Sequence, residues 1–257
     1  VGHSYNVYGP LIAGATSILY EGLPTSPDAG VWWRICETYG VRTMFSSPTA
    51  VRVLKKQDEA WLKRYDLSKF QWLFLAGEPL DEPTARWITD GLGKTVIDNY
   101  WQTETGWPVL CLMPGVELKP VKFGSPGLPA PGYRLRVINE VTGEDAPAGE
   151  KGVLVIEPPM PPGCLTTVWR NDARFLASYF GHFKDLLYSS LDWAIRDEDG
   201  YTFILGRTDD VINVAGHRLG TREIEEAVAS HPAVAEAAVV GVQDDLKGQV
   251  PIVFATL

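Results

Sequence analysis

The sequence predicts an α/β protein: parallel sheet layers with helices, then a small antiparallel β subdomain, then the start of a small α+β domain. Strand-like and helix-like segments alternate over residues 1–115, as they do where parallel strands are joined by helices. Residues 116–206 hold short β-like runs among turns rich in Gly and Pro. Residues 211–257 hold one amphipathic helix and two apolar strand-like runs. These patterns define three successive parts of the chain.

The first elements follow from apolar spacing and from the glycines that end them. Residues 15–22 are typical of a strand that closes on Gly22. Residues 28–40 predict a helix that ends at Gly40, because four apolar residues share one face: Trp32, Ile35, Cys36 and Tyr39.

The alternation continues to the end of the first part. Five segments are expected in turn: strand 41–46, helix 51–56, strand 70–76, helix 81–93 and strand 95–100. Pro83 in the first turn and Gly93 at the end mark the limits of the second of these helices. The expected sheet is therefore parallel.

Polar loops follow three of these strands. They cover Ser46–Thr49, Gly77–Pro79 and Trp101–Thr105. In open α/β sheets, ligands bind outside the carboxyl ends of the strands. The last loop, together with Tyr100, offers flat aromatic faces beside hydroxyls and a carboxylate, which suits a nucleotide with Mg²⁺.

The second and third parts contribute further candidate ligands. Asp192, expected on a turn of the β-rich part, could accept hydrogen bonds from both hydroxyls of a ribose. Arg207 and Arg218 offer forked donors to phosphate or ribose oxygens. Each residue alone is more typical of a surface turn, and only their ordered combination is specific. The expected helix over residues 221–231 has Thr221 as its cap and Ile224, Ala227 and Val228 on one face, and strands are expected over 234–242 and 250–257.

Composition excludes several classes of partner. The net charge is −9 and the pI is about 5.0, whereas nucleic acids and anionic membranes attract clustered Lys and Arg. The sequence contains no apolar run long enough to cross a bilayer. The three cysteines are widely spaced and are expected to be buried small hydrophobes in a reducing, cytosolic compartment: Cys36, Cys111 and Cys164.

Several motifs together resemble one family. They are GHSY and VYGPL near the start, PTA at 48–50, GEPLDEPTARW at 77–87, IDNYWQTETGWP at 97–108, GRTDDVINVAGHRLGTREIE at 206–225 and HPAVAEAAVVG at 231–241. They resemble the adenylate-forming acyl-CoA synthetases, in the short-chain branch of propionate and acetate ligases, and the resemblance covers essentially the whole chain. It implies the adenylating fold of that family. It also implies ATP-dependent ligation of a short-chain carboxylate to CoA through an acyl-adenylate, with release of AMP and pyrophosphate, propionate favoured and acetate possible.

The resemblance assigns nucleotide roles to matching residues. The turn Gly77, Glu78 and Pro79 corresponds to the adenine side. The run that encloses base and phosphates corresponds to Asp98, Asn99, Tyr100, Trp101, Gln102 and Thr103. Glu104 corresponds to the carboxylate of the Mg²⁺ site, Asp192 and Arg207 to the ribose ligands, and Arg218 to the phosphate arginine. Thr103, Glu104 and Arg218 form the expected catalytic set.

The resemblance also implies sites for the other substrates and a hinge. Ala215 and, more weakly, Thr25 match positions near CoA, and Asp209 matches a hinge at 207–210 between a large and a small domain. Trp101 would form the wall of the acyl pocket and Ala76 would leave room for propionate. A cation would be held by His231 with the carbonyls of Ala229 and Val234, or His231 would cap a helix and need no metal.

The chain reads as an internal piece of a longer polypeptide, located in the cytoplasm or, in a eukaryote, in the mitochondrial matrix. The phosphate loop and the C-terminal lysine of the family are not among its residues, and Lys247 is expected to be a surface residue, so the 257 residues alone are expected to be inactive. Its partners would be the small-molecule substrates and the remainder of its own polypeptide. Two alternatives stay open: an adenylating enzyme that acylates a carrier-protein thiol, and a nucleotide-binding fragment without catalysis.

Overall fold

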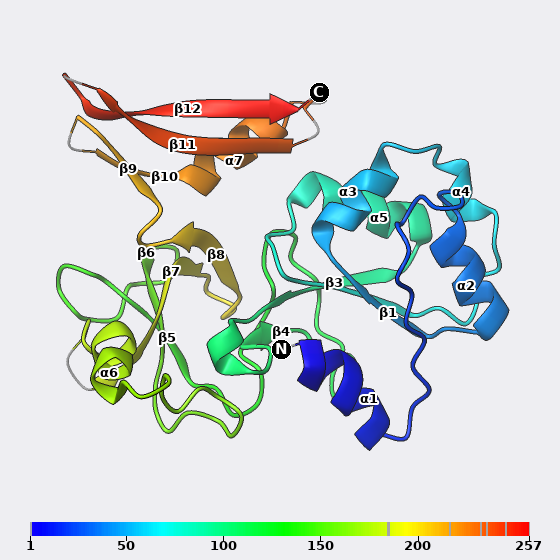
Figure 1. Cartoon of the computed structure of the whole chain (residues 1–257), viewed down its shortest axis with the longest axis horizontal. Coiled ribbons are helices and arrows are strands. Elements are labelled where there is room, and N and C mark those ends of the chain that lie inside the picture. The colour runs from blue at the N-terminus through cyan, green and yellow to red at the C-terminus, as the bar shows by residue number, and fades with distance from the viewer. Residues whose placement is uncertain are drawn as a thin grey trace. The chain divides into compact units, whose positions relative to one another are not determined.

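The chain forms two compact units. The first contains residues 1–131 and 161–165, and the second contains residues 132–160 and 166–257. The structure is a computed structural model that describes the following residues: 2–183, 186–215, 217–231, 233–234, 236–244 and 246–256. Figure 1 shows the elements in chain order from blue to red.

The sheet of the first unit is parallel over its first three strands, as predicted. The strand order is β1-β2-β3-β4, with β4 antiparallel to β3. The bounds are β1 Thr43–Ser46, β2 Trp72–Leu75, β3 Thr95–Tyr100 and β4 Leu110–Cys111. Register places Phe45 of β1 opposite Phe74 of β2, and Phe74 opposite Ile97 of β3. The three parallel strands therefore end at one edge.

The helices between these strands end where glycine permits. The short first elements are η1 His3–Tyr8 and α1 Gly9–Ile12, and the connecting helices are α2 Val31–Tyr39, α3 Pro48–Lys55, α4 Ala60–Lys63 and α5 Glu82–Leu92. Gly40 ends α2 at φ 62° and Gly93 ends α5 at φ 60°, a left-handed conformation that glycine adopts without a steric penalty. Both ends confirm the prediction.

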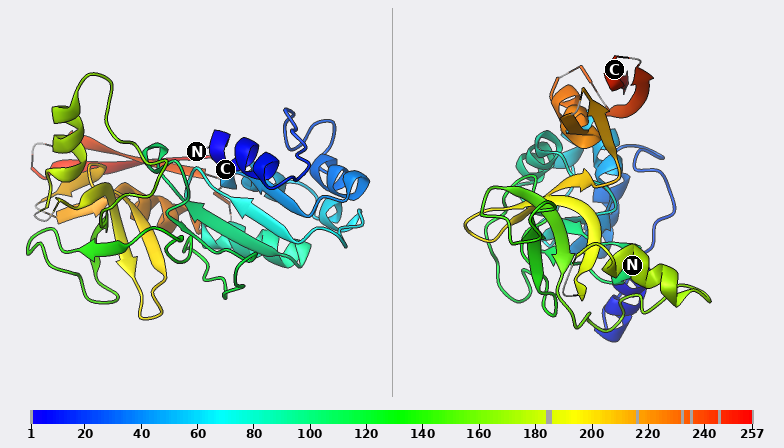
Figure 2. Two further views of the ribbon diagram at one scale, coloured as in Figure 1. Left: turned by 90° about the horizontal axis from the view of Figure 1, so that it is seen from below. Right: turned by 90° about the vertical axis from the view of Figure 1, so that its left-hand side faces the viewer.

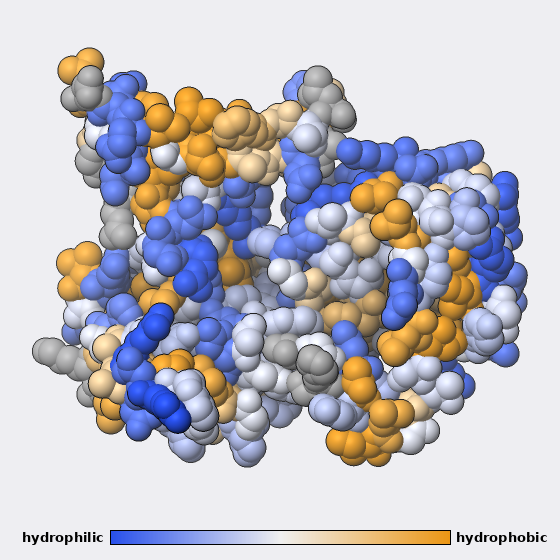
Figure 3. Space-filling model, viewed as in Figure 1, coloured by the Kyte–Doolittle hydropathy of each residue, from blue (hydrophilic) through white to orange (hydrophobic). Residues whose placement is uncertain are grey.

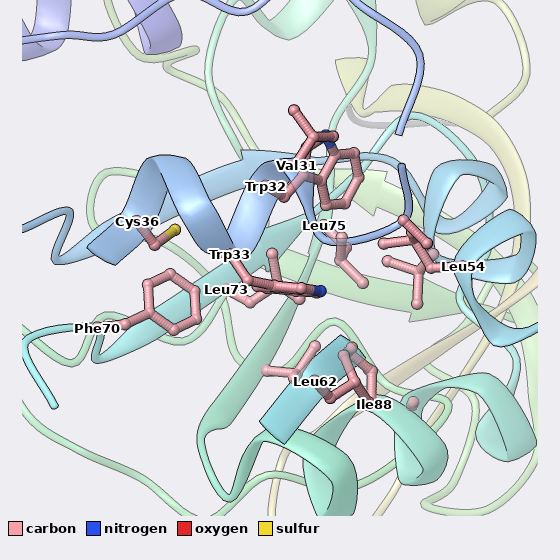
Figure 4. Close-up of a cluster of buried hydrophobic side chains, with 14 of the residues drawn as sticks. Val31, Trp32, Trp33, Cys36, Leu54, Leu62, Phe70, Leu73, Leu75 and Ile88 are labelled. Atoms are coloured by element: carbon pink, nitrogen blue, oxygen red, sulfur yellow. The ribbon is translucent and has the colours of Figure 1, made fainter. Parts of the chain in front are cut away.

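The core of the first unit lies between these helices and the sheet. Trp33 of α2, Leu73 and Leu75 of β2 and Ile88 of α5 are fully buried and point toward one another (Figure 4). Phe70 packs edge-on against Trp33, with ring centroids 6.4 Å apart. This apolar burial is the main stabilising term of the unit and holds the strand ends in place.

Three predictions for the first unit need correction, and one helix was missed. Residues 15–22 form no strand and are exposed, because β-branched and aromatic residues make a strand only where a neighbouring strand pairs with them. Helix α3 begins at Pro48 instead of residue 51, since the Ser47 hydroxyl accepts a hydrogen bond from the Ala50 amide at 3.3 Å and proline suits the first turn. Tyr39 is 67% exposed, so the buried face of α2 ends earlier than its spacing indicates. Helix α4 was not predicted.

The first sheet of the second unit is antiparallel, as predicted, in the order β5-β6-β7-β8. Its strands are β5 Leu135–Ile138, β6 Lys151–Ile156, β7 Tyr188–Arg196 and β8 Thr202–Arg207, and helix α6 Asp172–Phe180 was not predicted. Asp192 lies inside β7 and not on a turn. Its neighbour Leu191 has φ 60°, and the β7–β8 register shifts just after Trp193, so the strand is irregular at this point.

The second sheet of this unit has the order β10-β9-β12-β11. Its elements are β9 Val211–Val214, β10 His217–Gly220, α7 Thr221–Ala229, β11 Glu236–Asp244 and β12 Gly248–Thr256. Strands β11 and β12 were predicted, and they pair as a long antiparallel hairpin whose strands run side by side in the left view of Figure 2. The β9–β10 hairpin was not predicted.

Two details of helix α7 differ from the prediction. Gly220 occupies the N-cap position without a side-chain cap. The Thr221 hydroxyl instead donates to Asp210 Oδ2 at 2.8 Å, because Thr221 already lies in the first turn. Ala227 is exposed, so only Ile224 and Val228 of the predicted face are half-buried.

Apolar side chains are also exposed on the second unit. They gather over β11 and β12 in Figure 3, where Val240, Ile252 and Phe254 are between 42% and 62% exposed. The predicted burial of the three cysteines is confirmed, and burial raises the pKa of both Cys36 and Cys111 to about 12. Within the part of the chain that the structure describes, no helix is both long and apolar enough to cross a bilayer.

Candidate functional site

The three predicted polar loops lie at one edge of the first unit's sheet. Each begins where a strand ends, at Ser46 of β1, Leu75 of β2 and Tyr100 of β3. The Ala76 amide donates to the Ser46 carbonyl at 3.2 Å, so the first two loops remain in contact beyond the last ladder pair. The arrangement is the strand-end edge at which α/β sheets bind ligands.

The turn Gly77–Pro79 is fixed by hydrogen bonds from helix α3. Glu78 Oε1 accepts from the Thr49 amide at 2.7 Å, and Glu78 Oε2 accepts from the Thr49 hydroxyl at 2.7 Å and from Arg52 at 3.0 Å. Gly77 begins the turn with φ 98°, which a residue with a Cβ would rarely adopt. The turn is therefore rigidly connected to the loop that follows β1.

Trp101, the expected wall of an acyl pocket, is stacked on a side chain that the sequence analysis did not single out. The rings of Phe45 and Trp101 are nearly parallel at 12°, with centroids 5.6 Å apart. Ala76, the small residue expected in the same pocket, is 4% exposed at the end of β2. The signal for Phe45 was its place in β1, one residue before that strand ends.

The end of β3 carries a buried amide. Asn99 is 5% exposed, and its Nδ2 donates to the carbonyls of Leu75 at 3.0 Å and Ile97 at 3.2 Å. Its Oδ1 is buried without a hydrogen-bond partner among the described residues. Asp98 Oδ1 accepts from the Asn99 amide at 2.8 Å. These bonds orient the two residues that precede Tyr100.

The loop after β3 separates its hydroxyls into an inner and an outer one. Thr105 is buried; its hydroxyl accepts from the Gln102 amide at 3.1 Å, and its single proton is shared between the carbonyls of Gln102 at 2.9 Å and Trp107 at 3.0 Å. Thr103 is exposed and Glu104 half-buried in the short 3₁₀ helix η2 Thr103–Thr105. The outer pair is therefore accessible to a ligand, whereas Thr105 shapes the loop.

Residues 161–165 brace this loop from a distant part of the sequence. The Leu165 amide donates to the Glu104 carbonyl at 2.6 Å, and the Cys164 thiol donates to the Thr105 carbonyl at 3.4 Å. A Cβ at Gly106 would lie 2.5 Å from the Gly163 carbonyl oxygen, so the two backbones touch. The position of Glu104 thus depends on a segment about 60 residues further along the chain.

The second unit contains the predicted Asp192–Arg207 pair. The two residues are register partners in β7 and β8, and Arg207 Nη1 lies 4.0 Å from Asp192 Oδ1. Asp192 is 6% exposed, and its amide donates to the Ser190 hydroxyl at 3.2 Å. Arg207 Nε donates to Asp209 at 3.1 Å, and this hydrogen bond lowers the pKa of Asp209. The expected ribose pair and the expected hinge residue are therefore in contact.

The remaining predicted residues lie on turns and on the last sheet. Ala215 turns the β9–β10 hairpin with φ 49°, and its amide donates to the Lys247 carbonyl at 2.8 Å. Lys247 is exposed, as expected, and Thr25 lies half-buried in a turn. Arg218 belongs to β10, but its side chain lies outside the described residues.

His231 follows α7 in a tight local turn. Its Nδ1 accepts from the Ala233 amide at 3.2 Å, and its carbonyl accepts from the Val234 amide at 2.9 Å. Within the described ranges, no cluster of three His, Cys, Asp or Glu side chains could hold a metal ion. The cation site predicted at His231 is of another kind, because its other ligands would be the backbone carbonyls of Ala229 and Val234.

A hollow of about 800 Å³ lies at the opposite end of the first unit's sheet. It is formed by the end of α5, the start of β3 and the segment 118–123. None of the residues predicted to bind nucleotide, CoA, acid or cation lines it. The candidate site is therefore placed at the hydrogen-bonded loops and not at this hollow.

Comparison with known proteins agrees with the geometry. Residues 1–161 match the family model described as AMP-binding enzyme, and residues 223–257 match AMP-binding enzyme C-terminal domain. The chain is 60% identical over 254 residues to the propionate–CoA ligases of Salmonella typhimurium and Escherichia coli, covering 99% of this chain and 40% of each relative. It is 46% identical over 259 residues to the acetyl-coenzyme A synthetase of Pyrobaculum aerophilum, covering 38% of that relative.

A solved structure gives the same fold. The anthranilate CoA ligase in complex with anthranoyl-AMP superimposes with a TM-score of 0.81 and 25% identity, covering 99% of this chain and 46% of that one. The chain spans about 40% of the length of the curated relatives it matches. Because the family model covers more than half of the chain, the protein belongs to the AMP-binding enzyme family and has its adenylating fold.

Proposed function

We propose that these residues form part of an AMP-forming ligase that joins a short-chain carboxylate, with propionate preferred, to CoA. The observation that carries the proposal is the edge formed by the loops after β1, β2 and β3, where aromatic, hydroxyl and carboxylate groups are held side by side. The 60% identity to proteins named propionate–CoA ligase supports the short acid.

The nucleotide would be bound by two groups of residues. The turn Gly77–Pro79 and the run from Asp98 to Gln102 would enclose the base, with Tyr100 stacked on it. Asp192 would accept from the ribose hydroxyls, with Arg207 and Arg218 beside the phosphates. The closeness of Asp192 and Arg207 supports this role, because it brings the two expected nucleotide ligands together on neighbouring strands.

The donor set after β3 fits Mg²⁺ that arrives with a triphosphate. Mg²⁺ prefers oxygen ligands and is usually held by one or two carboxylates together with substrate phosphates. Glu104 supplies one half-buried carboxylate beside the exposed hydroxyl of Thr103. When bound, the ion would neutralise phosphate charge, while Thr103 orients the phosphate at which the acid attacks.

The reaction would proceed in two displacements. A carboxylate oxygen attacks the α-phosphorus of ATP and expels pyrophosphate, which gives the acyl-adenylate. The CoA thiol then attacks the acyl carbon and releases AMP. Both steps need positioning and charge stabilisation more than acid–base catalysis, which agrees with a site made of short fixed loops.

Trp101 would close the acyl pocket behind the carboxylate. Its stack on Phe45 leaves it little freedom to move aside for a longer chain. Ala76 would leave room for the extra methylene of propionate, which is worth about 1–3 kcal/mol of discrimination. Acetate is therefore expected to be a poorer substrate and not an excluded one.

The second displacement would use the hinge and the small domain. We propose a large domain formed by 1–115 and the β-rich 116–206, a hinge at 207–210 that contains Asp209, and a small domain that begins at 211. Ala215 and Thr25 would lie near CoA, and His231 with the carbonyls of Ala229 and Val234 would hold a structural cation. The hydrogen bond between Arg207 and Asp209 supports this assignment, because it links one of the expected ribose ligands to the expected hinge residue.

The experiment is an assay of the full-length protein that contains these residues. With ATP, Mg²⁺, CoA and propionate, it is expected to form propionyl-CoA and AMP, and more slowly acetyl-CoA with acetate. Transfer to a carrier-protein thiol in place of CoA, or nucleotide binding without AMP release for any short acid, contradicts the proposal. The 257 residues alone are expected to form no propionyl-CoA, because the family's phosphate loop and lysine are not among them.

A further inference from the structure

Arg52 lies where three segments of the first unit meet. From helix α3, its Nε donates to Asp81 Oδ2 at 2.9 Å, its Nη1 to Glu78 Oε2 at 3.0 Å and its Nη2 to the Pro79 carbonyl at 2.8 Å. Each of the three guanidinium nitrogens thus has its own acceptor. Only the rigid planar fork of arginine can donate in these three directions at once.

The carboxylate of Glu78 is engaged mainly within the protein. It accepts from the amide and hydroxyl of Thr49, each at 2.7 Å, and from Arg52. Charge-assisted hydrogen bonds of this kind are about twice as strong as neutral ones. Glu78 therefore acts as a tether that holds the turn after β2 against α3.

Asp81 connects the same arginine to helix α5. Its Oδ1 accepts from the Thr84 amide at 2.8 Å and caps the helix, while its Oδ2 accepts from Arg52. The side chains of Arg52, Glu78 and Asp81 are 22%, 32% and 21% exposed, whereas those of the surface pair Arg86–Glu82 are 57% and 55% exposed. The Arg52 bonds are therefore less screened by water than an ordinary surface ion pair.

We propose that Arg52 is a positioning residue that presets the Gly77–Pro79 turn for the adenine base. The inference rests on the proposed function, in which this turn forms the adenine side of the site. The turn contains a glycine with positive φ, so its own backbone does not restrict it, and the Arg52 fork supplies the restraint from outside. Preorganised contacts of this kind improve affinity by reducing the ordering that a ligand must impose.

The test is steady-state kinetics of the full-length protein with Arg52→Lys, which keeps the positive charge but loses the fork. The KM for ATP is expected to rise about tenfold and the preference for ATP over GTP to fall, because the turn no longer has one fixed conformation. The KM for propionate is expected to change by less than about twofold, since the acyl pocket is built from other residues. Arg86→Lys, in the exposed pair on α5, is the matched control and should change none of these values.

A milder pair of variants separates positioning from folding. Thr49→Val removes one hydrogen bond to Glu78 and should raise the KM for ATP about threefold, whereas Thr49→Ser keeps the hydroxyl and should restore it. A general loss of stability would instead lower kcat and affect both substrates alike. Unchanged KM and base preference in Arg52→Lys would overturn the inference.

Direct binding of AMP, measured by calorimetry, distinguishes this inference from the proposed function. If the wild-type protein binds AMP but ligates no acid, the proposed function fails. A weaker AMP affinity in Arg52→Lys would then still support the positioning role of Arg52. If the wild type ligates propionate and Arg52→Lys binds AMP as tightly as the wild type does, only the positioning role of Arg52 fails. Absence of AMP binding in the wild type would overturn both.

Discussion

Trp101 and Ala76 are the two residues on which the proposed acid preference depends. Trp101 cannot rotate freely, because its ring is stacked on Phe45 with centroids 5.6 Å apart. Ala76 is 4% exposed, so any added atoms must occupy space that is closed to solvent. A change of one or two carbons at either position is therefore expected to alter the size of the acid that fits.

Ala76→Val is expected to shift the preference from propionate to acetate. The two added methyl groups would fill the space of the substrate's terminal methyl, and the ratio of kcat/KM for propionate to that for acetate should fall at least about tenfold. The measurement is a comparison of both acids in the full-length protein. An unchanged ratio would show that Ala76 does not face the acid.

Phe45→Leu is expected to loosen Trp101 while keeping an apolar side chain below it. An aromatic pair contributes about 0.5–1.5 kcal/mol beyond its buried area, so selectivity against butyrate should fall by about two- to tenfold. Phe45→Tyr keeps the stack and serves as the control. Equal selectivity in the wild type and both variants would show that Phe45 does not help to form the acyl pocket.

The loop after β3 packs against residues 161–165 through a close backbone contact at Gly106. It can approach residues 161–165 only because Gly106 has no Cβ: a methyl group there would lie 2.5 Å from the Gly163 carbonyl oxygen. Gly93 has nearly the same backbone, with φ 60° against 63° for Gly106, but no atom within 4 Å of its would-be Cβ. A substitution at Gly93 therefore tests backbone strain alone, whereas the same substitution at Gly106 tests strain together with a steric clash.

Gly106→Ala is therefore expected to lower the thermal midpoint of unfolding more than Gly93→Ala does. Both variants carry the strain of a left-handed alanine, about 1–2 kcal/mol, but only the first adds a clash with backbone. Gly106→Ala should also reduce kcat, because the Glu104 carbonyl is hydrogen-bonded to the same brace. Equal midpoints and equal kcat would mean that residues 161–165 move aside for the added methyl group without loss of stability or activity.

Asp81 gives a pH dependence at the start of helix α5. Burial by itself would raise its pKa, but the hydrogen bonds from Thr84 and Arg52 hold the pKa below its ordinary value of 3.8. A lowered folded-state pKa stabilises the protein above the unfolded-state pKa, and this contribution is lost as the pH falls through the folded-state value. The stability gained from Asp81 is thus complete at pH 7, begins to decline near the ordinary pKa of 3.8, and is lost only below the folded-state pKa.

Asp81→Asn tests this linkage. Asparagine still caps the helix, so the variant removes mainly the charge that faces Arg52. The difference in free energy of unfolding between wild type and variant should be largest near neutral pH and shrink toward pH 3. Asp90→Asn, on the exposed side of the same helix, is the control. A difference that does not vary with pH would contradict the assignment.

Local sequence patterns predicted the parallel sheet and its three loops, because apolar spacing and helix-ending glycines act over short distances. They did not predict that residues 15–22 lack a strand, since that depends on a pairing partner elsewhere. They placed Asp192 on a turn because the left-handed Leu191 and the bulge beside it have no signature in the sequence. Phe45 and Arg52 were missed because their roles arise only when distant loops meet.

The whole molecule consists of two units that the chain connects at three points: between residues 131 and 132, 160 and 161, and 165 and 166. The proposed nucleotide ligands are divided between them. The turn Gly77–Pro79 and Tyr100 belong to the first unit, and Asp192 and Arg207 belong to the second. The claim central to the proposed function is that the first group binds the base, and the second the ribose, of the same adenosine phosphate.

The most direct measurement is a crystal structure of the full-length protein with a non-hydrolysable propionyl-adenylate analogue. The account predicts the base against the Gly77–Pro79 turn and the ribose hydroxyls within about 3 Å of the Asp192 carboxylate. An analogue bound by one unit alone, with Asp192 remote from its ribose, would contradict the central claim.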